Sequence, residues 1–110
     1  MPYDERLAER IRTLLEDDPA VSEQRMFGGL AFLINGNMAV AASGQGGLLL
    51  RVDPAESAKL QRTAGVEPMV MRGRAMDGWL RIDDDAARTT RQLQRWVDIG
   101  VAYARSLPPK

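Results

Sequence analysis

The dipeptide Asn35-Gly36 constrains the fold of this chain more than any other feature. Apolar runs at residues 30–34 and 38–42 flank it on both sides. An Asn-Gly pair between two such runs is the strongest short-range signal for a two-residue type I′ β-hairpin. We therefore expect an antiparallel sheet to begin early in the chain.

Further strands and helices follow from the turn residues and the apolar periodicity. The remaining strands are expected at residues 21–27, 48–52, 69–72 and 79–82, and helices near 4–16, 54–64 and 85–105. The predicted fold class is α+β: an antiparallel sheet of five to six strands with three helices, in the order α-β(4)-α-β(2)-α. The 110 residues are enough for one domain, 1–110, and not for two.

Aspartates mark the predicted starts of the helices. Asp53 precedes Pro54, a good combination of N-cap and first helical residue. The run Asp83-Asp84-Asp85 precedes the last helix, where the helix dipole favours negative charge. Three consecutive carboxylates cannot all converge on one ion, so capping explains them better than a metal site.

Two absences limit the chemistry of the chain. There is no histidine, the commonest general base, and no cysteine, so thiolate catalysis and Cys-ligated zinc are excluded. Fifteen basic and fifteen acidic residues cancel, so the net charge does not support nonspecific nucleic-acid binding. No segment has the length of a membrane span or the apolar core of a signal peptide. We expect a cytoplasmic protein with no catalytic residue, no cofactor and no metal.

Four short motifs carry a family resemblance. They are Arg25-Met26-Phe27-Gly28-Gly29, the Asn35-Gly36 hairpin, Gly73-Arg74-Ala75-Met76-x-Gly78, and the ending Ala104-Arg105-Ser106-Leu107-Pro108-Pro109-Lys110. Together they resemble the TfoX N-terminal domain family, that of the TfoX/Sxy competence regulators, in a short single-domain branch. Ala75 stands where that family usually has proline, which suggests a freer loop.

The resemblance implies architecture more than activity. It implies a compact α+β domain with helices packed on an antiparallel sheet, and it offers no catalytic residues to transfer. We therefore expect a non-enzymatic interaction or regulatory module of the bacterial cytoplasm. The competence regulators carry a second, helical domain, so their role in DNA uptake carries over only weakly.

An alternative function rests on arginines near residues 73–78, which we expect to form a glycine-bounded loop. Arg72, Arg74 and Arg81, with Arg51 as a weaker candidate, form a basic patch if they share one sheet face. Such a patch suits a small anion or nucleic acid. The competing interpretation is a set of solvated strand arginines neutralised by nearby aspartates.

Strand alternation suggests a second apolar face. Leu30, Phe32 and Ile34 are expected on one face with Met38 and Val40, while Leu33, Leu49 and Trp79 take the opposite phase with Ala39 and Ala41. We expect Leu33, Leu49 and Trp79 to form a homodimer interface, because a large exposed apolar patch marks an interface. Two alternatives are coverage by the chain's own second helix and an incorrect strand phase. The strand methionines Met38, Met69 and Met71 are expected to fill the core.

Overall fold

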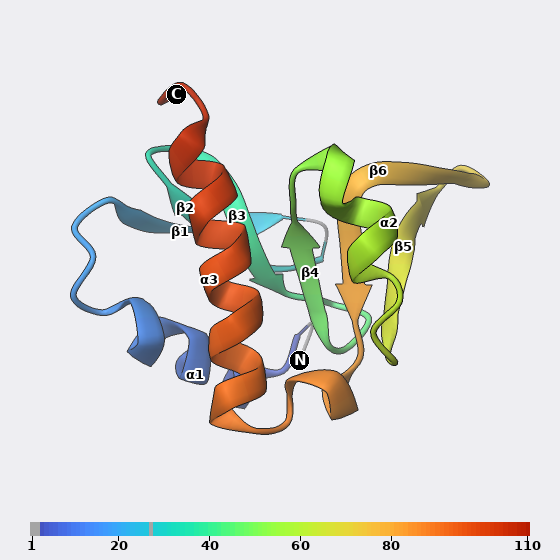
Figure 1. Ribbon diagram of the computed structural model, residues 1–110. Helices are drawn as coiled ribbons and strands as arrows, with labels where there is room; N and C mark the ends of the chain where they lie inside the picture. The colour runs from blue at the N-terminus through green and yellow to red at the C-terminus, as the bar shows by residue number, and fades with distance from the viewer. Residues whose placement is uncertain (1–2, 27) are drawn as a thin grey trace.

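A six-stranded antiparallel sheet forms the body of the molecule (Figure 1). The computed structural model describes residues 3–26 and 28–110. The sheet order is β1-β2-β3-β4-β6-β5, so β1 and β5 are its edges. The strands are β1 (Val21–Met26), β2 (Gly29–Ile34), β3 (Asn37–Ala42), β4 (Leu48–Arg51), β5 (Val66–Met71) and β6 (Arg74–Ile82). The predicted α+β class is confirmed, while Phe27, expected at the end of the first strand, lies outside the described residues.

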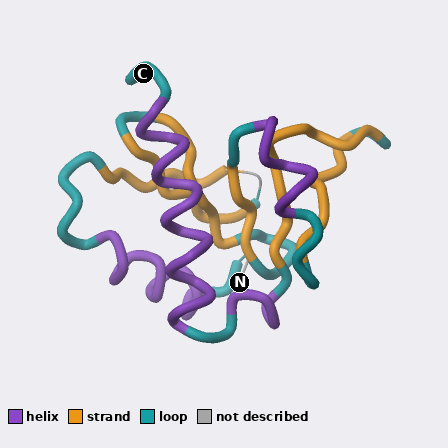
Figure 2. The backbone as a smooth tube through the Cα atoms, in the orientation of Figure 1, coloured by secondary structure: helices purple, strands orange, loops and turns teal. Residues whose placement is uncertain are grey.

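Three α-helices and two 3₁₀ turns lie on one side of the sheet (Figure 2). They are α1 (Glu5–Leu15), η1 (Pro54–Glu56), α2 (Ser57–Leu60), η2 (Asp84–Ala87) and α3 (Thr90–Ser106). The predicted helix at 54–64 is wrong in length, because α2 ends at Leu60. The predicted helix at 85–105 is divided: Asp83 caps only the 3₁₀ turn, and Thr89 starts α3 through a capping box with Gln92.

The β2–β3 hairpin has the predicted geometry. Asn35 and Gly36 both have positive φ, at 52° and 84°, as a type I′ turn requires. The pairing is not regular throughout, because Phe32 lies opposite Val40 while Leu33 lies opposite Met38. One residue of β3, Ala39, is therefore extra, which is the definition of a β-bulge.

The main core lies between the sheet and the helices. Trp96 of α3 is 1% exposed, and its indole Nε1–H donates to the Ala86 carbonyl at 2.9 Å. Phe32, Ile11 and Leu80 are buried in the same cluster, which collects side chains from all three helices and from strands across the sheet. In the short helix α2, Leu60 is partly buried against this cluster, and such packing rather than local propensity is what stabilises short helices.

Gly100 marks the closest approach of α3 to the sheet. A Cβ atom built there would lie 2.5 Å from the Ala39 carbonyl oxygen and 2.8 Å from a methyl carbon of Leu50. The bulged residue of β3 thus occupies the space that a side chain on α3 would need. Only glycine lets the helix pack this closely against β3.

The second face of the sheet carries a separate apolar cluster. Ala31, Leu33, Met38, Ala41 and Leu49 are all buried there, with Met26, Met69 and Trp79 packed against them. We call these eight residues the second-face cluster. In a flat sheet β1 and β5 would lie roughly 24 Å apart. Met26 of β1 and Met69 of β5 nevertheless pack against the same cluster, so the sheet must be strongly curved. Figure 1 shows the same bend, with β1 and β2 running across the direction of β4 and β6.

The predicted strand phase is wrong for two residues of β3. Met38 belongs to the second-face cluster with Leu33, whereas Ala39 packs with Ile34 and Ala104 under α3. The bulge is the reason, since one extra residue reverses the alternation of side chains beyond it.

Replacement of Gly100 by alanine tests the close contact between α3 and β3. Helix propensity alone favours alanine by about 1 kcal/mol. We predict the opposite sign, a loss of about 1–3 kcal/mol in the free energy of unfolding, because the new Cβ meets the Ala39 backbone. Urea denaturation measures it, with Ala102→Gly on the exposed side of α3 as the propensity control. An increase in stability for Gly100→Ala would contradict the contact.

Candidate functional site

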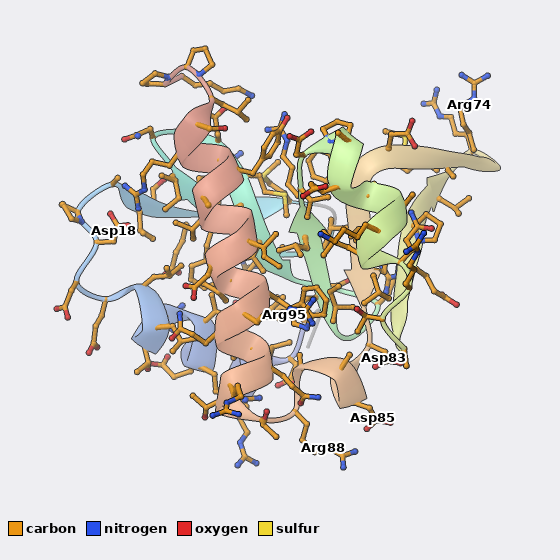
Figure 3. All side chains as sticks on the ribbon, viewed as in Figure 1. Asp18, Arg74, Asp83, Asp85, Arg88 and Arg95 are labelled. Carbon is orange, nitrogen blue, oxygen red and sulfur yellow. The ribbon has the colours of Figure 1, made fainter. Side chains whose placement is uncertain are left out.

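The β5–β6 hairpin projects from the body of the molecule (Figures 1 and 3). Its turn is Arg72-Gly73, with φ values of 53° and 77°, and Met71 lies opposite Arg74. The predicted loop at residues 73–78 is therefore wrong: β6 begins at Arg74 and runs through this segment. A single two-residue turn accounts for the difference, because Arg72 adopts the left-handed conformation that glycine and asparagine more often supply.

The hairpin tip, residues 70–75, combines apolar and basic groups. Val70 is 58% exposed and Met71 is 41% exposed, and these are the large apolar side chains that stand out as exposed among the described residues. Arg72 and Arg74 are exposed beside them. Figure 3 shows Arg74 at the far end of the hairpin, directed away from the body. No ion pair joins either tip arginine to another described residue.

Sequence reasoning missed Val70 and misplaced Met71. Both lie in a run that predicts a strand. Core filling was expected for Met71, and that prediction is wrong because Met71 is 41% exposed. The hairpin extends past the other strands, because β4 pairs with β6 only at residues 79–82. The sequence signal for this exposed tip was Gly73, which lies between two runs with strand composition. A glycine in that position marks a turn, and the turn marks the end of a hairpin.

Arg81 does not join the tip arginines. It lies seven residues beyond Arg74 along β6, roughly 20 Å at the rise of an extended strand. Its guanidinium faces Ser43 Oγ at 3.4 Å and the Gly46 carbonyl at 3.3 Å. There it lines a shallow cleft of about 620 Å³ that also contains Arg62, Glu67, Asp83 and Asp84. The structure thus brings Arg72 and Arg74 together and separates Arg81 from them.

Arg51, the weaker candidate, is engaged by aromatic rings. Its Cζ lies 5.3 Å from the ring centre of Trp79 and 5.7 Å from that of Tyr103. These distances suit cation–π contacts, which connect the end of β4 to β6 and to α3. Arg51 is therefore a packing residue in this structure and not part of the tip.

The predicted interface residues meet in space but not at an open surface. Leu33 and Leu49 lie in the second-face cluster, and Trp79 packs against them. Leu33 is only 6% exposed and Leu49 only 2%. The premise that this face is an exposed apolar patch is therefore wrong. Curvature brings Met26 and Met69 over the cluster, so the face is covered within the chain, and the second helix is not what covers it.

The three consecutive aspartates serve local structure. Asp83 Oδ1 accepts a hydrogen bond from the Ala86 amide at 2.9 Å, and Asp85 forms an ion pair with Arg88. The described residues contain no group of three acidic side chains placed to hold a metal ion.

One ion pair joins β1 to α1, and a second joins the loop before β1 to α3. Arg12 of α1 donates to Glu23 of β1 from Nε at 2.7 Å and from Nη2 at 2.9 Å, and these hydrogen bonds hold the pKa of Glu23 below its usual value. Asp18 accepts from the Ala20 amide and from Arg105 of α3, and both contacts lower the pKa of Asp18. Both carboxylates are stabilised in their charged form, as in a structural ion pair.

The fold and these surfaces define a small α+β domain. Residues 13–104 match the model of the TfoX N-terminal domain family, so the chain belongs to that family. No curated protein shows significant similarity to it. Across the described helices, none combines the length and the apolar character needed to span a bilayer.

Replacement of Asp18 by asparagine tests the ion pair between the loop before β1 and Arg105 of α3. Because the folded pKa of Asp18 is lowered, its contribution is present above the unfolded pKa, ordinarily 3.8, and is lost as the pH falls through the folded value. Asparagine still accepts from Ala20 but does not pair with Arg105. We predict a lower melting temperature for Asp18→Asn at neutral pH, with the difference from the parent chain narrowing between about pH 5 and pH 2. A difference independent of pH would contradict this assignment.

Proposed function

We propose that this chain is a non-enzymatic interaction module that binds a protein partner through the hairpin tip. The observation that carries the proposal is the exposure of Val70 and Met71 beside two arginines without an ion-pair partner among the described residues. Isolated surface apolar residues are ordinary, but here they lie together at a projecting turn. Arginine and methionine are enriched at protein interfaces.

The charges at the tip indicate the chemistry of the partner. Arg72 and Arg74 present guanidinium groups that match carboxylates in a bidentate manner. Met71 offers a flexible apolar side chain that adapts to irregular surfaces. A partner segment with an apolar stripe and flanking acidic residues fits both features.

Contact by side chains is favoured over strand addition at this hairpin. The Asp83 amide donates to the Gly65 carbonyl at 2.9 Å, so the backbone of Gly65 faces β6. Alternation then directs the backbone of Val66 and Pro68 outward, where Pro68 has no N–H and the Val66 amide is bonded to Thr63. The outer edge of β5 therefore lacks a free amide donor at both Val66 and Pro68, which hinders the addition of another strand there.

The lowered pKa values of Glu23 and Asp18 do not suit either carboxylate to act as a general acid at neutral pH. A general acid at neutral pH needs a carboxyl group with a raised pKa. Glu23 and Asp18, the carboxylates with a resolved shift, both have a lowered pKa caused by hydrogen bonds. The proposal also keeps the bacterial cytoplasm as the place of action, as the resemblance to the TfoX/Sxy regulators implies.

The test uses a synthetic helical peptide with one apolar stripe and glutamates on both sides of it. We expect amide shift changes in two-dimensional NMR spectra to concentrate at residues 69–76. The double variant Arg72→Glu/Arg74→Glu should weaken binding at least about tenfold, with little change in stability, because both side chains are exposed.

The matched control is Arg6→Glu/Arg91→Glu, which makes the same change in net charge at exposed helix positions away from the tip. It should leave peptide affinity nearly unchanged. Equal losses of peptide affinity in the two double variants would show that net charge alone causes the effect. Amide shift changes located away from the hairpin would reject the tip as the contact surface.

A second candidate, nucleic-acid binding, is favoured by the two adjacent tip arginines. Each phosphate contact contributes about −0.9 to the slope of log affinity against log salt on duplex DNA. If the tip binds DNA, Arg72→Ala and Arg74→Ala should each reduce that slope by about 1. Fluorescence anisotropy with a mixed-sequence duplex at several salt concentrations measures it. Absence of binding at low salt would leave the protein partner as the sole proposal.

A further inference from the structure

The two edges of the sheet differ in how they are protected against pairing. Strand β5 carries Pro68 and an irregular register next to it, both devices that prevent a second strand from adding. Strand β1 has neither device: its six residues pair with β2 without a register shift. Ser22, Glu23, Gln24 and Arg25 are all exposed along it.

The free backbone groups of β1 can be assigned from its first pair. The Asn35 amide donates to the Ala20 carbonyl at 3.1 Å, so the backbone of Ala20 faces β2. In an antiparallel pair this direction alternates from residue to residue. Gln24 therefore directs its backbone toward β2, whereas Glu23 and Arg25 direct their N–H and C=O groups outward.

We propose that β1 pairs with β1 of a second copy of this chain, antiparallel and about a two-fold axis at Gln24. In this register Glu23 lies opposite Arg25 of the partner subunit, and Arg25 lies opposite Glu23 of the partner subunit. Each Glu–Arg pair exchanges both backbone hydrogen bonds, because the outward-facing groups of the two residues meet. A two-fold contact uses the same surface on both copies, so one continuous sheet runs through the dimer.

The charge pattern specifies this register. An axis at Glu23 would place two carboxylates opposite each other, and an axis at Arg25 would place two guanidinium groups opposite each other. Like charges directly opposite across strands are destabilising, whereas opposite charges stabilise. Only the axis at Gln24 makes both charged pairs complementary.

The surroundings of the two charged residues fit the same contact. Arg12 holds the Glu23 carboxylate on the helix-covered side of β1, at 2.7 Å from its Nε. A carboxylate has lone pairs for further donors, so Glu23 can accept from a second guanidinium. Arg25 is exposed and has no ion-pair partner among the described residues.

This contact goes beyond the proposed function and is independent of the hairpin tip, because β1 and β5 are opposite edges of the sheet. It also differs from the interface expected from the sequence, which used Leu33, Leu49 and Trp79. Variants at residues 23–25 therefore test self-association without changing residues 70–75.

A charge exchange between two variants tests the pairing. We expect a dimer for the parent chain in sedimentation equilibrium at high micromolar concentration. Arg25→Glu and Glu23→Arg should each weaken the dimer at least about tenfold, because like charges then face each other. An equimolar mixture of the two variants should restore it, since each acidic pair then faces a basic pair.

The control for net charge is Arg91→Glu on α3, which should leave self-association unchanged. A monomeric parent chain, a single variant that remains a full dimer, or a mixture that stays monomeric would each overturn the proposal. Circular dichroism verifies that every variant is folded, which matters for Glu23→Arg because it also removes the partner of Arg12.

A cysteine cross-link makes the test independent of that variant. The chain has no cysteine, so Gln24→Cys introduces a single thiol at the two-fold axis. The two copies of residue 24 form a pair without mutual backbone hydrogen bonds, with Cα atoms about 4.5 Å apart, within the range of a disulfide. We expect fast disulfide dimerisation for Gln24→Cys and slow dimerisation for Ser22→Cys, which lies opposite Met26 of the partner subunit. Equal rates would overturn the proposal.

Discussion

Burial of the central strands on both faces is the constraint on which the structure depends. Every residue of β2 and β3 is buried. Such strands must carry apolar or small side chains on both faces, as residues 29–34 and 38–42 do. The buried polar exception is Asn37, whose side-chain amide donates to the Pro108 carbonyl at 2.9 Å. One face is covered by α1, α2 and α3, whereas curvature of the sheet gathers Met26, Met69 and Trp79 onto the other. The central part of the sheet is thereby removed from contact with other molecules.

Contact surfaces are left at the periphery of the sheet. The β5–β6 hairpin continues beyond the end of β4 and exposes Val70 and Met71 at its tip. The edge of β1 exposes charged side chains on a strand of regular register. The difference between the edges has a physical basis, because Pro68 removes a donor from β5 where β1 keeps its own. The β5 edge thus lacks two donors for strand pairing while its hairpin tip offers side chains, and the β1 edge keeps its donors.

The sequence predicted the sheet well because its signals are local. Asn35-Gly36 specifies its own turn, and the α+β class follows from apolar periods of two and near four. The sequence predicted the structure less well wherever contacts between residues distant in the chain determine the local conformation or burial. The bulged residue Ala39 lies against Gly100 of α3, and no local pattern in the sequence marks the bulge. The covering of Leu33 and Leu49 depends on Met69, which is distant in the sequence and approaches only when the sheet curves.

Prediction of the candidate site from the sequence succeeded and failed in the same way. Arg72 and Arg74 were expected near each other and do lie at the same turn, since only Gly73 separates them in the chain. Arg81 was expected with them because it lies on the same stretch, yet extension of β6 carries it to the opposite end of the strand. The expected loop at residues 73–78 treated the two glycines as its ends. In the structure Gly73 belongs to the turn, whereas Gly78 lies inside β6, so the strand runs through this segment.

Substitution of Leu33 by glutamate tests most directly whether the second sheet face is internal. Leu33 is 6% exposed and packs within the second-face cluster. A carboxylate there would lose hydration without gaining a partner among the residues of that cluster. We predict a loss of about 3 kcal/mol or more in the free energy of unfolding, or failure to fold at neutral pH. A variant with the thermal stability of the parent chain and a lost ability to self-associate would contradict internal burial and identify this face as the interface.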